Sequence, residues 1–583
     1  MQDHKQTEEE FSFKRYFVPL TTVKAITWVV VVGFIVYFNS LFNSFVGDDY
    51  IYIINFLPSH TVNLSSAFGQ SVFNTAGQYR PLAALFFSIL YTFFGTNAFF
   101  YHIVQLFLHI VCAILLFVVF RKFFSLSITF FSTLIFLVHP LQVESVVYIA
   151  QMDNEIFFIF GILAFLLSLK KKISVGIITT IGLLLLFSFL AKETGVLFFL
   201  LIITYSFLFN RKHVIKFLSV GILSLAIYGF IRYSVGHVGL DTRHLGPIAM
   251  APLSQRLISL PAIVFYYVKS FVYPVFLAYD QQWVITSTDI KHFYFPLIAD
   301  ILFFAIIFLI GFGIIKKEKK NLKLFLFFCV WFFSGLGLIM QIYPLDATVA
   351  DRWFYFPLAG LLGIIGLGMQ LVIKRYPNLK TASIVTVVGI LVLLSVRTIV
   401  RNTNWTNSLT IFSHDVKVSE NPNIDENLAY ELISANQDQE GIIYLQKSVE
   451  ALPDSSNLYD LGILYEKSHA YIKAEYYYSL SLAQKDRSYG QNEVRKNAYD
   501  GLARVLTFHD NPENAKKFLD SALKVYPQDG SYWVYLAIVD YTLGDQNESL
   551  AAAEKAKTLL NNSTVNLLYY RIVNKKPLNV RLQ

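Results

Sequence analysis

Residues 97–120 read NAFFYHIVQLFLHIVCAILLFVVF, a run that contains no Asp, Glu, Lys or Arg. Crossing the hydrocarbon core of a bilayer takes about 20 apolar residues in a helix, so this run is long enough to span a membrane. It is not isolated, because 55% of the 583 residues are hydrophobic and only 15% are charged. An average soluble domain is about a quarter charged. We therefore expect a polytopic membrane protein and exclude a soluble globular enzyme, a disordered chain and a disulfide scaffold.

The two parts of the chain differ in charge. Residues 1–400 carry 29 Lys and Arg against 17 Asp and Glu, whereas the remainder carries 19 against 23. We expect a membrane domain (1–400), a linker (401–421) and a soluble domain (422–583). The basic excess is typical of cytoplasmic loops, and no nucleic-acid motif accompanies it. The two cysteines, Cys112 and Cys329, lie in apolar segments and cannot form a zinc site.

Eleven apolar segments are predicted to span the membrane. They are 25–45, 97–120, 123–138, 155–169, 173–190, 194–209, 213–233, 295–315, 322–342, 353–373 and 380–398. Two further segments, 81–94 and 257–279, are short or interrupted by proline and lysine, so we expect them to lie along the interface or to re-enter. Most basic loops then fall on the N-terminal side, as the positive-inside rule requires. The prediction is a bundle of about 11–13 membrane helices, with the N-terminus inside and the C-terminus outside.

Residues 422–583 are polar and contain a repeat with a period near 34 residues. Leu502, Ala503, Ala515, Leu519 and Ala522 are matched 34 residues later by Leu536, Ala537, Ser549, Ala553 and Ala556. Small residues at fixed positions let paired helices pack closely, and the pattern resembles about four tetratricopeptide (TPR) repeats over 422–560. Such solenoids offer a concave surface for peptides or protein partners. The alternative is an unrelated helical bundle.

Two adjacent carboxylates, Asp48 and Asp49, follow the first predicted span on its outer side. Like charges this close repel each other, so at least one carboxyl is expected to be protonated, metal-bound or paired with a cation. A carboxylate at a membrane surface can also act as a general base toward a hydroxyl group. The pair also suits a solvated helix end, so the motif alone leaves both roles open.

Further polar residues lie near the outer ends of the other predicted spans. Arg80, Lys192 and Arg352 can each bind a phosphate group, although snorkelling of long side chains to the interface explains them equally well. The others are Tyr79, His102, His139, Glu144, Asp153, Glu193, Asp351 and Tyr355. His102 shares a helix face with His109, and both are more typical of buried hydrogen-bonded histidines than of metal ligands. The common side of these residues predicts one amphipathic cavity, because polar clusters between spans are costly unless they line one.

The order of these motifs resembles that of a known family. The matching pieces are Asp48-Asp49, Tyr79-Arg80-Pro81-Leu82, Tyr101-His102 with His109, His139-Pro140 with Glu144, Ala191-Lys192-Glu193, and Asp351-Arg352 with Tyr355 and Pro357. The chain is similar to glycosyltransferases of the GT-C fold, and more closely to the transmembrane and TPR-containing O-mannosyltransferases and their bacterial relatives. The resemblance implies an all-α fold, in which a GT-C type transmembrane bundle is followed by a TPR α-solenoid on the outer face.

The resemblance also implies roles for these residues. The family takes sugars from polyprenyl- or dolichyl-phosphate donors, so Asp48 or Asp49 would be the general base that activates the acceptor hydroxyl. Arg80, Lys192 and Arg352 would stabilise the charge that grows on the leaving phosphate. The remaining polar residues would shape the sugar or acceptor pocket. No metal site is assigned, although the acid pair could hold a divalent metal. Some relatives carry a Gly-Arg-Ala-Asp-like run where this chain has Gln151-Met152-Asp153-Asn154.

We therefore expect an integral-membrane glycosyltransferase that moves a sugar, with mannose as the first candidate, from a polyprenyl-phosphate donor to a protein hydroxyl. The reaction would occur on the periplasmic or lumenal face, and the repeats would present the acceptor or bind a protein partner. Two alternatives are transfer to a lipid or cell-envelope glycan, and a non-catalytic TPR scaffold. A transporter is less consistent, because no duplicated half with broken helices is found. The membrane would be the plasma membrane in a bacterium and the endoplasmic reticulum in a eukaryote.

Overall fold

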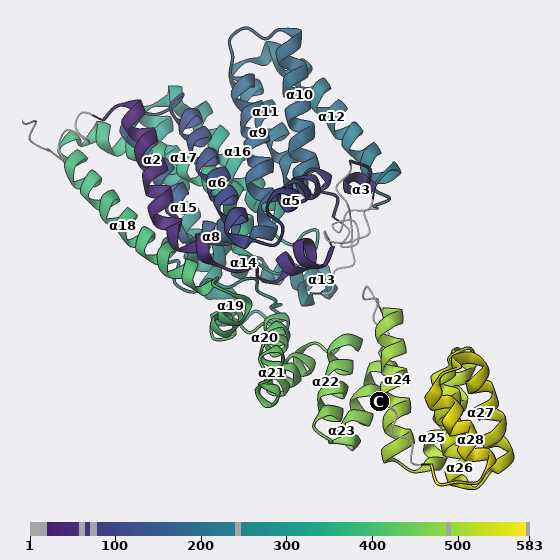
Figure 1. Ribbon diagram of the computed structural model, residues 1–583. Helices are drawn as coiled ribbons and strands as arrows, with labels where there is room; N and C mark the ends of the chain where they lie inside the picture. The colour runs from purple at the N-terminus through teal and green to yellow at the C-terminus, as the bar shows by residue number, and fades with distance from the viewer. Residues whose placement is uncertain (1–19, 57–63, 70–77, 239–245, 485–490, 579–583) are drawn as a thin grey trace, which may run out of the picture. The chain divides into compact units, whose positions relative to one another are not determined.

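The computed structural model describes residues 20–56, 64–69, 78–238, 246–484 and 491–578. It is 81% helical, and no strand occurs within these ranges, which confirms the all-α prediction. Part of the basic N-terminal segment used for the topology prediction lies outside the described residues. The chain divides into two compact units, residues 1–421 and 422–583 (Figure 1).

The first unit contains the apolar helices. They are α2 (Thr22–Tyr37), α3 (Leu64–Gly69), α5 (Pro81–Phe94), α6 (Ala98–Phe120), α7 (Leu126–Val138), α8 (Val143–Val147), α9 (Asp153–Ser168), α10 (Val175–Ala191), α11 (Val196–Phe209), α12 (Val214–Ser234), α13 (Pro247–Met250), α14 (Leu253–Val272), α15 (Phe295–Lys317), α16 (Leu322–Leu338), α17 (Tyr355–Arg375), α18 (Lys380–Asn404) and α19 (Ser408–Asp415). Residues 401–421, expected as a linker, contribute the end of α18 and the whole of α19 to this unit.

Eight helices among the described residues are long and apolar enough to cross a membrane, so the first unit has the make-up of a multi-pass membrane protein. They correspond to eight of the eleven predicted spans. The other three correspond to α7, which continues into α8 through a 52° bend, and to the shorter helices α10 and α11. The 14-residue helix α5 is also apolar but short, and α14 contains Pro261 and is not among the eight.

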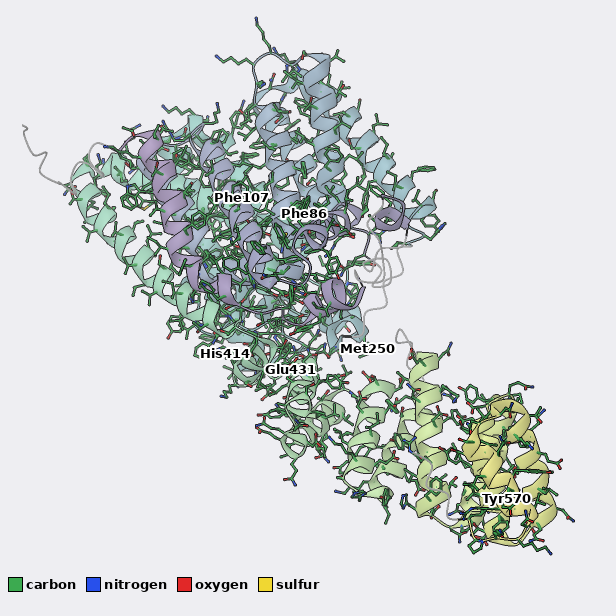
Figure 2. All side chains as sticks on the ribbon, in the orientation of Figure 1. Phe86, Phe107, Met250, His414, Glu431 and Tyr570 are labelled. Atoms are coloured by element: carbon green, nitrogen blue, oxygen red, sulfur yellow. The ribbon has the colours of Figure 1, made fainter. Side chains whose placement is uncertain are left out.

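Some apolar side chains of this unit face outward, and others fill its interior. Phe107 on α6 is 58% exposed, as expected for a residue that faces lipid (Figure 2). Inside, the rings of Phe165, Phe327 and Trp331 pack together, with centroids 5.4 to 6.0 Å apart. These aromatic contacts join α9 to α16, and α9, α10, α11 and α12 stand side by side (Figure 1).

Helices α16 and α17 approach so closely that glycine is required at the contact. A Cβ atom on Gly360 would lie 2.5 Å from the backbone nitrogen of Phe332, and one on Gly335 would lie 2.7 Å from Cγ of Pro357. Small residues are common at such contacts because membrane helices associate through close van der Waals packing. The contact holds the start of α17 in place, just after the predicted phosphate-binding residue Arg352.

The second unit is an array of helix pairs followed by a last helix. Its helices are α20 (Pro422–Ser434), α21 (Asp438–Ala451), α22 (Ser455–Lys467), α23 (Tyr471–Ala483), α24 (Gln491–His509), α25 (Pro512–Val525), α26 (Gly530–Leu543), α27 (Gln546–Leu560) and α28 (Ser563–Val573). The small residues of the 34-residue pattern, such as Ala503, Ala515, Ala537 and Ala553, are fully buried between helices. Gly544, with φ +86°, ends α26 at the turn where the pattern places it. The assignment to TPR repeats stays a prediction.

We expect Gly360→Ala to destabilise the protein by about 1–3 kcal/mol, the usual range for overpacking. The added methyl group would overlap the backbone of Phe332, which cannot rotate away as a side chain could. The measurement is the thermal unfolding midpoint of the detergent-purified protein. The control is Gly389→Ala on α18, where no atom lies within 4 Å of the added carbon. Equal midpoints for the two variants would contradict the close contact of α16 and α17.

Candidate active site

The acid pair lies in residues 43–49, the acid loop, which connects the short helical segments η1 (Phe38–Phe42) and η2 (Tyr50–Phe56). Asp48 and Asp49 are helical and lead directly into η2. Asp49 is 1% exposed, and its carboxylate accepts hydrogen bonds from the backbone N–H groups of Val46 (3.0 Å) and Ala150 (2.6 Å). Burial raises the pKa of Asp49 well above its usual value, and the backbone donors only partly offset this effect. Asp49 therefore joins its loop to the segment before α9.

The environment of Asp48 is different. Its side chain is partly exposed, and its backbone N–H donates to the hydroxyl oxygen of Tyr148 at 2.9 Å. Burial raises the pKa of Asp48, and a hydrogen bond from the Tyr148 hydroxyl lowers it by a smaller amount. No backbone N–H binds the Asp48 carboxylate among the contacts of the described residues. Of the two acids, Asp48 is the more exposed residue.

A network of ion pairs joins α9, α10 and α12 to the segment before α5. Asp153, fully buried at the first residue of α9, accepts from Arg80 at 2.7 Å and from Nζ of Lys192 at 3.0 Å. Arg80 also pairs with Glu193 at 3.0 Å, and Glu193 is 3.4 Å from Arg232 in the last turn of α12. The predicted residues Arg80, Asp153, Lys192 and Glu193 are thus brought together.

A second ion pair links α8 to the start of α17. The carboxylate of Glu144 is bound by the guanidinium of Arg352 and by the backbone N–H of Arg352, the latter at 2.8 Å. Arg352 also donates to the carbonyl oxygen of Tyr279 at 3.4 Å. Glu144 is 1% exposed at its side chain, so this ion pair is buried and each group supplies the partner that a buried charge needs.

A small cavity of about 30 Å³ has both Lys192 and Arg352 in its walls. These walls are mostly apolar. They are formed by Asn154, Phe157, Lys192, Thr194, Leu197, Gly335, Leu338, Ile339, Arg352, Trp353, Tyr355, Phe356 and Pro357. Lys192 also donates to the side-chain oxygen of Asn154 at 2.7 Å. The cavity therefore combines two cations with apolar residues of α9, α11, α16 and α17.

Farther along the same two helices lies a larger groove of about 470 Å³. Its walls are almost entirely apolar. They are formed by Ile203, Thr204, Phe207 and Leu208 of α11 and by Leu326, Cys329, Val330 and Phe333 of α16. Helices α11 and α16 thus carry a cationic cavity near one end and an apolar groove farther along.

The predicted histidines have structural partners. His102 is 3.1 Å from the carbonyl oxygen of Asn43, and His139 is 3.0 Å from the carbonyl oxygen of Phe271. His109 is 3.0 Å from the hydroxyl of Tyr355. None of these three side chains lines the cavity between Lys192 and Arg352.

Three other predicted pocket residues are held within the protein. Asp351 accepts a hydrogen bond of 2.5 Å from the hydroxyl of Tyr266, and Tyr355 is one of the residues that line the cavity. Tyr79 is buried, and its backbone N–H donates to Glu193 at 3.0 Å. Tyr79 therefore positions Glu193, and only Tyr355 of these three contributes to the cavity.

Sequence reasoning missed three residues next to the site. Arg232 lies at the same ends of the helices as the other cations, and its place in the last turn of a predicted span was an available signal. Tyr148 and Tyr279 bind each other through their hydroxyl groups at 2.9 Å and hold the loop of Asp48. They are 131 residues apart, and no local motif marks either of them.

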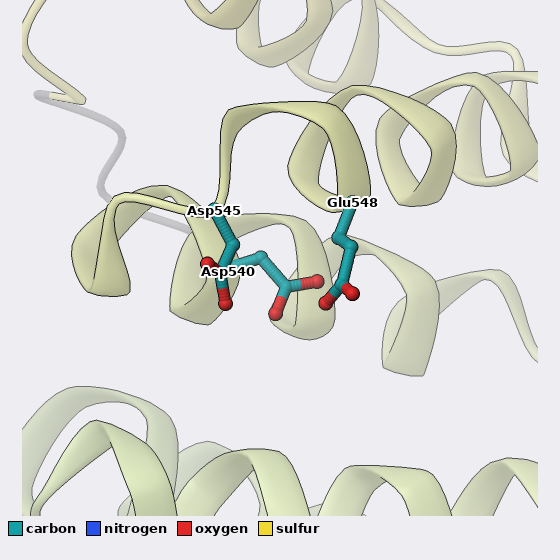
Figure 3. A group of neighbouring side chains, drawn as sticks. All are labelled: Asp540, Asp545 and Glu548. Carbon is teal, nitrogen blue, oxygen red and sulfur yellow. The ribbon is translucent and has the colours of Figure 1, made fainter.

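A group of side chains with metal-ligand spacing occurs in the second unit, not among the site acids that the structure describes. Asp540, Asp545 and Glu548 point toward one another (Figure 3). The ammonium group of Lys516 already pairs with all three, at 2.8, 3.1 and 2.5 Å respectively. Lysine therefore supplies the positive charge that these carboxylates need.

Comparison with known proteins places these residues in context. No protein-family model matches the chain. The chain is 25% identical over 405 residues to protein O-mannosyl-transferase F38B6.6 of Caenorhabditis elegans, covering 67% of this chain and 57% of that protein. It is 22% identical over an alignment of 619 residues to human protein O-mannosyl-transferase TMTC3, covering 91% and 67%. The mouse TMTC3 protein is also 22% identical, covering 79% and 54%.

These matches confirm the resemblance to O-mannosyltransferases that the motifs indicate. The similarity extends over most of this chain, but the chain spans only 54 to 67% of the length of these relatives.

Asp280 lies beside Arg352 and titrates near neutral pH. Its carboxylate accepts a hydrogen bond of 2.7 Å from the side chain of Asn421. Burial raises the pKa of Asp280 to about 7, an effect that Arg352 opposes and Asp346 reinforces. The unfolded chain has an aspartate pKa of about 3.9. Protonated Asp280 therefore contributes to the stability of the folded protein. This contribution is fully present below about pH 4 and is lost as the pH rises through 7.

We expect Asp280→Asn to weaken the pH dependence of stability. Asparagine keeps the size and an acceptor oxygen but cannot ionise. The thermal midpoint of the unaltered protein should fall between pH 5 and pH 8 more steeply than that of the variant. The control is Asp520→Asn, which removes an exposed carboxyl group on α25 and should leave the slope unchanged. Parallel curves for Asp280→Asn and the unaltered protein would show that Asp280 does not titrate in this range.

Proposed function

We propose that this chain is an integral-membrane glycosyltransferase that transfers a sugar from a polyprenyl-phosphate donor to a hydroxyl group of a protein. Mannose is the sugar that the relatives' names suggest. The observation that carries the proposal is a cavity with Lys192 and Arg352 in its walls, an apolar groove farther along the same helices, and a hydrogen-bonded link from Arg352 through Tyr279 and Tyr148 to Asp48. A lipid-linked phosphate sugar needs these three features.

A series of hydrogen bonds connects the cation to the acid. Arg352 donates to the carbonyl oxygen of Tyr279, whose hydroxyl contacts that of Tyr148, and Tyr148 accepts the backbone N–H of Asp48. In this proposal a donor phosphate binds near Arg352 and its sugar meets an acceptor hydroxyl near Asp48. Proximity of this kind is a major part of enzymatic rate enhancement.

The proposed reaction is a single displacement at the anomeric carbon. Asp48 takes the proton from the acceptor hydroxyl, whose oxygen forms a bond to C1 of the sugar as the bond from C1 to the phosphate oxygen breaks. The lipid phosphate leaves with the electron pair, and the configuration at C1 is inverted. General-base catalysis of this type contributes about 10²–10⁴-fold to the rate.

The cations are suited to the leaving phosphate because several of them lie together. Arg80, Lys192 and Arg232 share one ion-pair network with Asp153 and Glu193, and Arg352 pairs with Glu144. Groups placed in advance where charge develops are usually the largest contribution to such catalysis.

The groove between α11 and α16 would receive the polyprenyl chain. It begins on the helices that wall the cationic cavity, so a lipid whose phosphate contacts Lys192 can extend along it. The helix pairs of the second unit would act as TPR repeats that present the acceptor protein or bind a partner. In this proposal the site and the second unit both face the periplasm or the lumen, as the predicted topology requires.

We expect Asp48→Asn to lower kcat about 10²–10⁴-fold, because asparagine cannot accept the acceptor proton. The assay is transfer from polyprenyl-phosphate mannose to a hydroxyl-containing acceptor peptide by the detergent-purified protein. Asp49→Asn is the matched variant: its carboxylate binds the N–H groups of Val46 and Ala150, so a lower thermal midpoint is expected. Full activity of Asp48→Asn would exclude it as the base.

We expect Lys192→Met and Val330→Trp to weaken donor binding in different ways. The first removes a phosphate contact, and the second fills the groove with an indole ring. Binding is measured as the thermal shift that polyprenyl-phosphate mannose produces, because a ligand of the folded state raises stability with concentration.

The matched control is Lys374→Met, which removes a 66% exposed lysine paired with Glu318. Because Lys192 is buried with Asp153, Val330→Trp provides a test that leaves the ion pairs intact. A polyprenyl phosphate without sugar separates recognition of the lipid from recognition of the sugar. If Val330→Trp keeps the full shift, the groove does not hold the lipid chain.

A further inference from the structure

An ion pair that the proposed reaction does not use joins the end of the last membrane helix to the segment after it. Arg401, near the end of α18, is 1% exposed, and it binds Asp415, the last residue of α19, at 3.1 Å. Asp415 is fully buried, and His414 contacts it at 2.6 Å. A buried ion pair is weak evidence for stability, because desolvation of both charges offsets their attraction. The ion pair of Arg401 and Asp415 therefore matters mainly because it fixes the positions of the groups around it.

That geometry concerns Tyr279. The second oxygen of Asp415 accepts a hydrogen bond of 2.5 Å from the backbone N–H of Tyr279. Two rings from the same segment pack against the ring of Tyr279, those of Trp405 and Phe412, each with its centroid 5.9 Å away. Trp405 also packs on Tyr148, at 5.3 Å. Tyr279 is thus held by its backbone and by its ring.

The hydroxyl of Tyr279 reaches the acid loop. It lies 2.9 Å from the hydroxyl of Tyr148, which accepts the backbone N–H of Asp48. Gly47 bends tightly over both hydroxyl groups with φ +54°, and a Cβ atom there would lie 3.3 Å from Tyr148 Oη and 3.4 Å from Tyr279 Oη. The two tyrosines therefore form the surface on which the loop of Asp48 rests.

We infer that Asp415, Tyr279 and Tyr148 are positioning residues that hold the carboxylate of Asp48 in its working place. This inference rests on the proposed function, because it assigns Asp48 as the base. Tyr148 contacts Asp48 directly, Tyr279 acts through Tyr148, and Asp415 acts through Tyr279. Residues 401–421 are then part of the catalytic apparatus of the first unit.

The test is Tyr279→Phe, which removes one hydroxyl group and keeps the ring against Trp405 and Phe412. We expect kcat to fall about tenfold with KM for donor and acceptor unchanged, because small displacements of a catalytic group lower the rate without weakening substrate binding. The control is Tyr273→Phe in the same connection, whose side chain is 57% exposed. An unchanged kcat for Tyr279→Phe would overturn the inference.

A double variant tests whether the tyrosines act in series. If Tyr279 acts through Tyr148, the pair Tyr148→Phe and Tyr279→Phe should lose no more activity than Tyr148→Phe alone. Losses that multiply would show that Tyr279 acts independently and would overturn the series.

The role of Asp415 is tested by replacing the ion pair rather than breaking it. Removing one partner would leave an uncompensated buried charge, so Arg401→Met is combined with Asp415→Leu. We expect a folded protein with lower kcat, because the N–H of Tyr279 loses its acceptor. A folded variant with full kcat would remove Asp415 from the series. The variant Asp48→Asn separates the two proposals. Full transfer activity of Asp48→Asn contradicts the proposed function itself. If Asp48→Asn loses activity while Tyr279→Phe keeps the full kcat, only the positioning role is contradicted.

Discussion

Asp153 is buried at the start of α9 and bound by both Arg80 and Lys192, and the geometry of the site depends on this contact. A charge without a partner at such depth costs several kcal/mol, so the three groups must be together in the folded state. Each comes from a different part of the chain. Their pairing therefore fixes the segment before α5, the start of α9 and the end of α10 relative to one another, and Glu193 adds α12 through Arg232.

The two neighbouring acids have different roles: one holds the backbone of the acid loop, and the other is the proposed base. Asp49 gives both of its oxygens to backbone N–H groups and so holds the loop, whereas the carboxylate of Asp48 remains partly exposed. Burial raises the pKa of both acids, and it raises that of Asp49 further. Two tyrosines hold the same loop, since Tyr148 accepts the backbone N–H of Asp48 and the hydroxyl of Tyr279 contacts that of Tyr148.

Much of this fold could be predicted from the sequence, because apolar runs and small-residue periodicity are local patterns. All eleven predicted spans are helical, and the alanines of the 34-residue pattern are buried. Arg80, Lys192, Asp153 and Glu193 were identified because charges near membrane helices are rare. Their partners could not be deduced, because pairing depends on tertiary contacts. For the same reason the sequence does not distinguish the roles of Asp48 and Asp49. It also does not mark Tyr148, Tyr279 or Asp415, because no local motif surrounds them and their contacts form only in the folded chain.

The contacts of α19 bear on how such a protein can be divided into modules. Asn421 binds both the side chain and the backbone of Asp280, and Asp415 binds Tyr279, so the chain remains part of the first unit until the residue before Pro422. A recombination that exchanged the helix pairs of the second unit could join the new segment only after this point. A junction placed at the end of the last membrane helix would preserve every span and yet remove the supports of the acid loop.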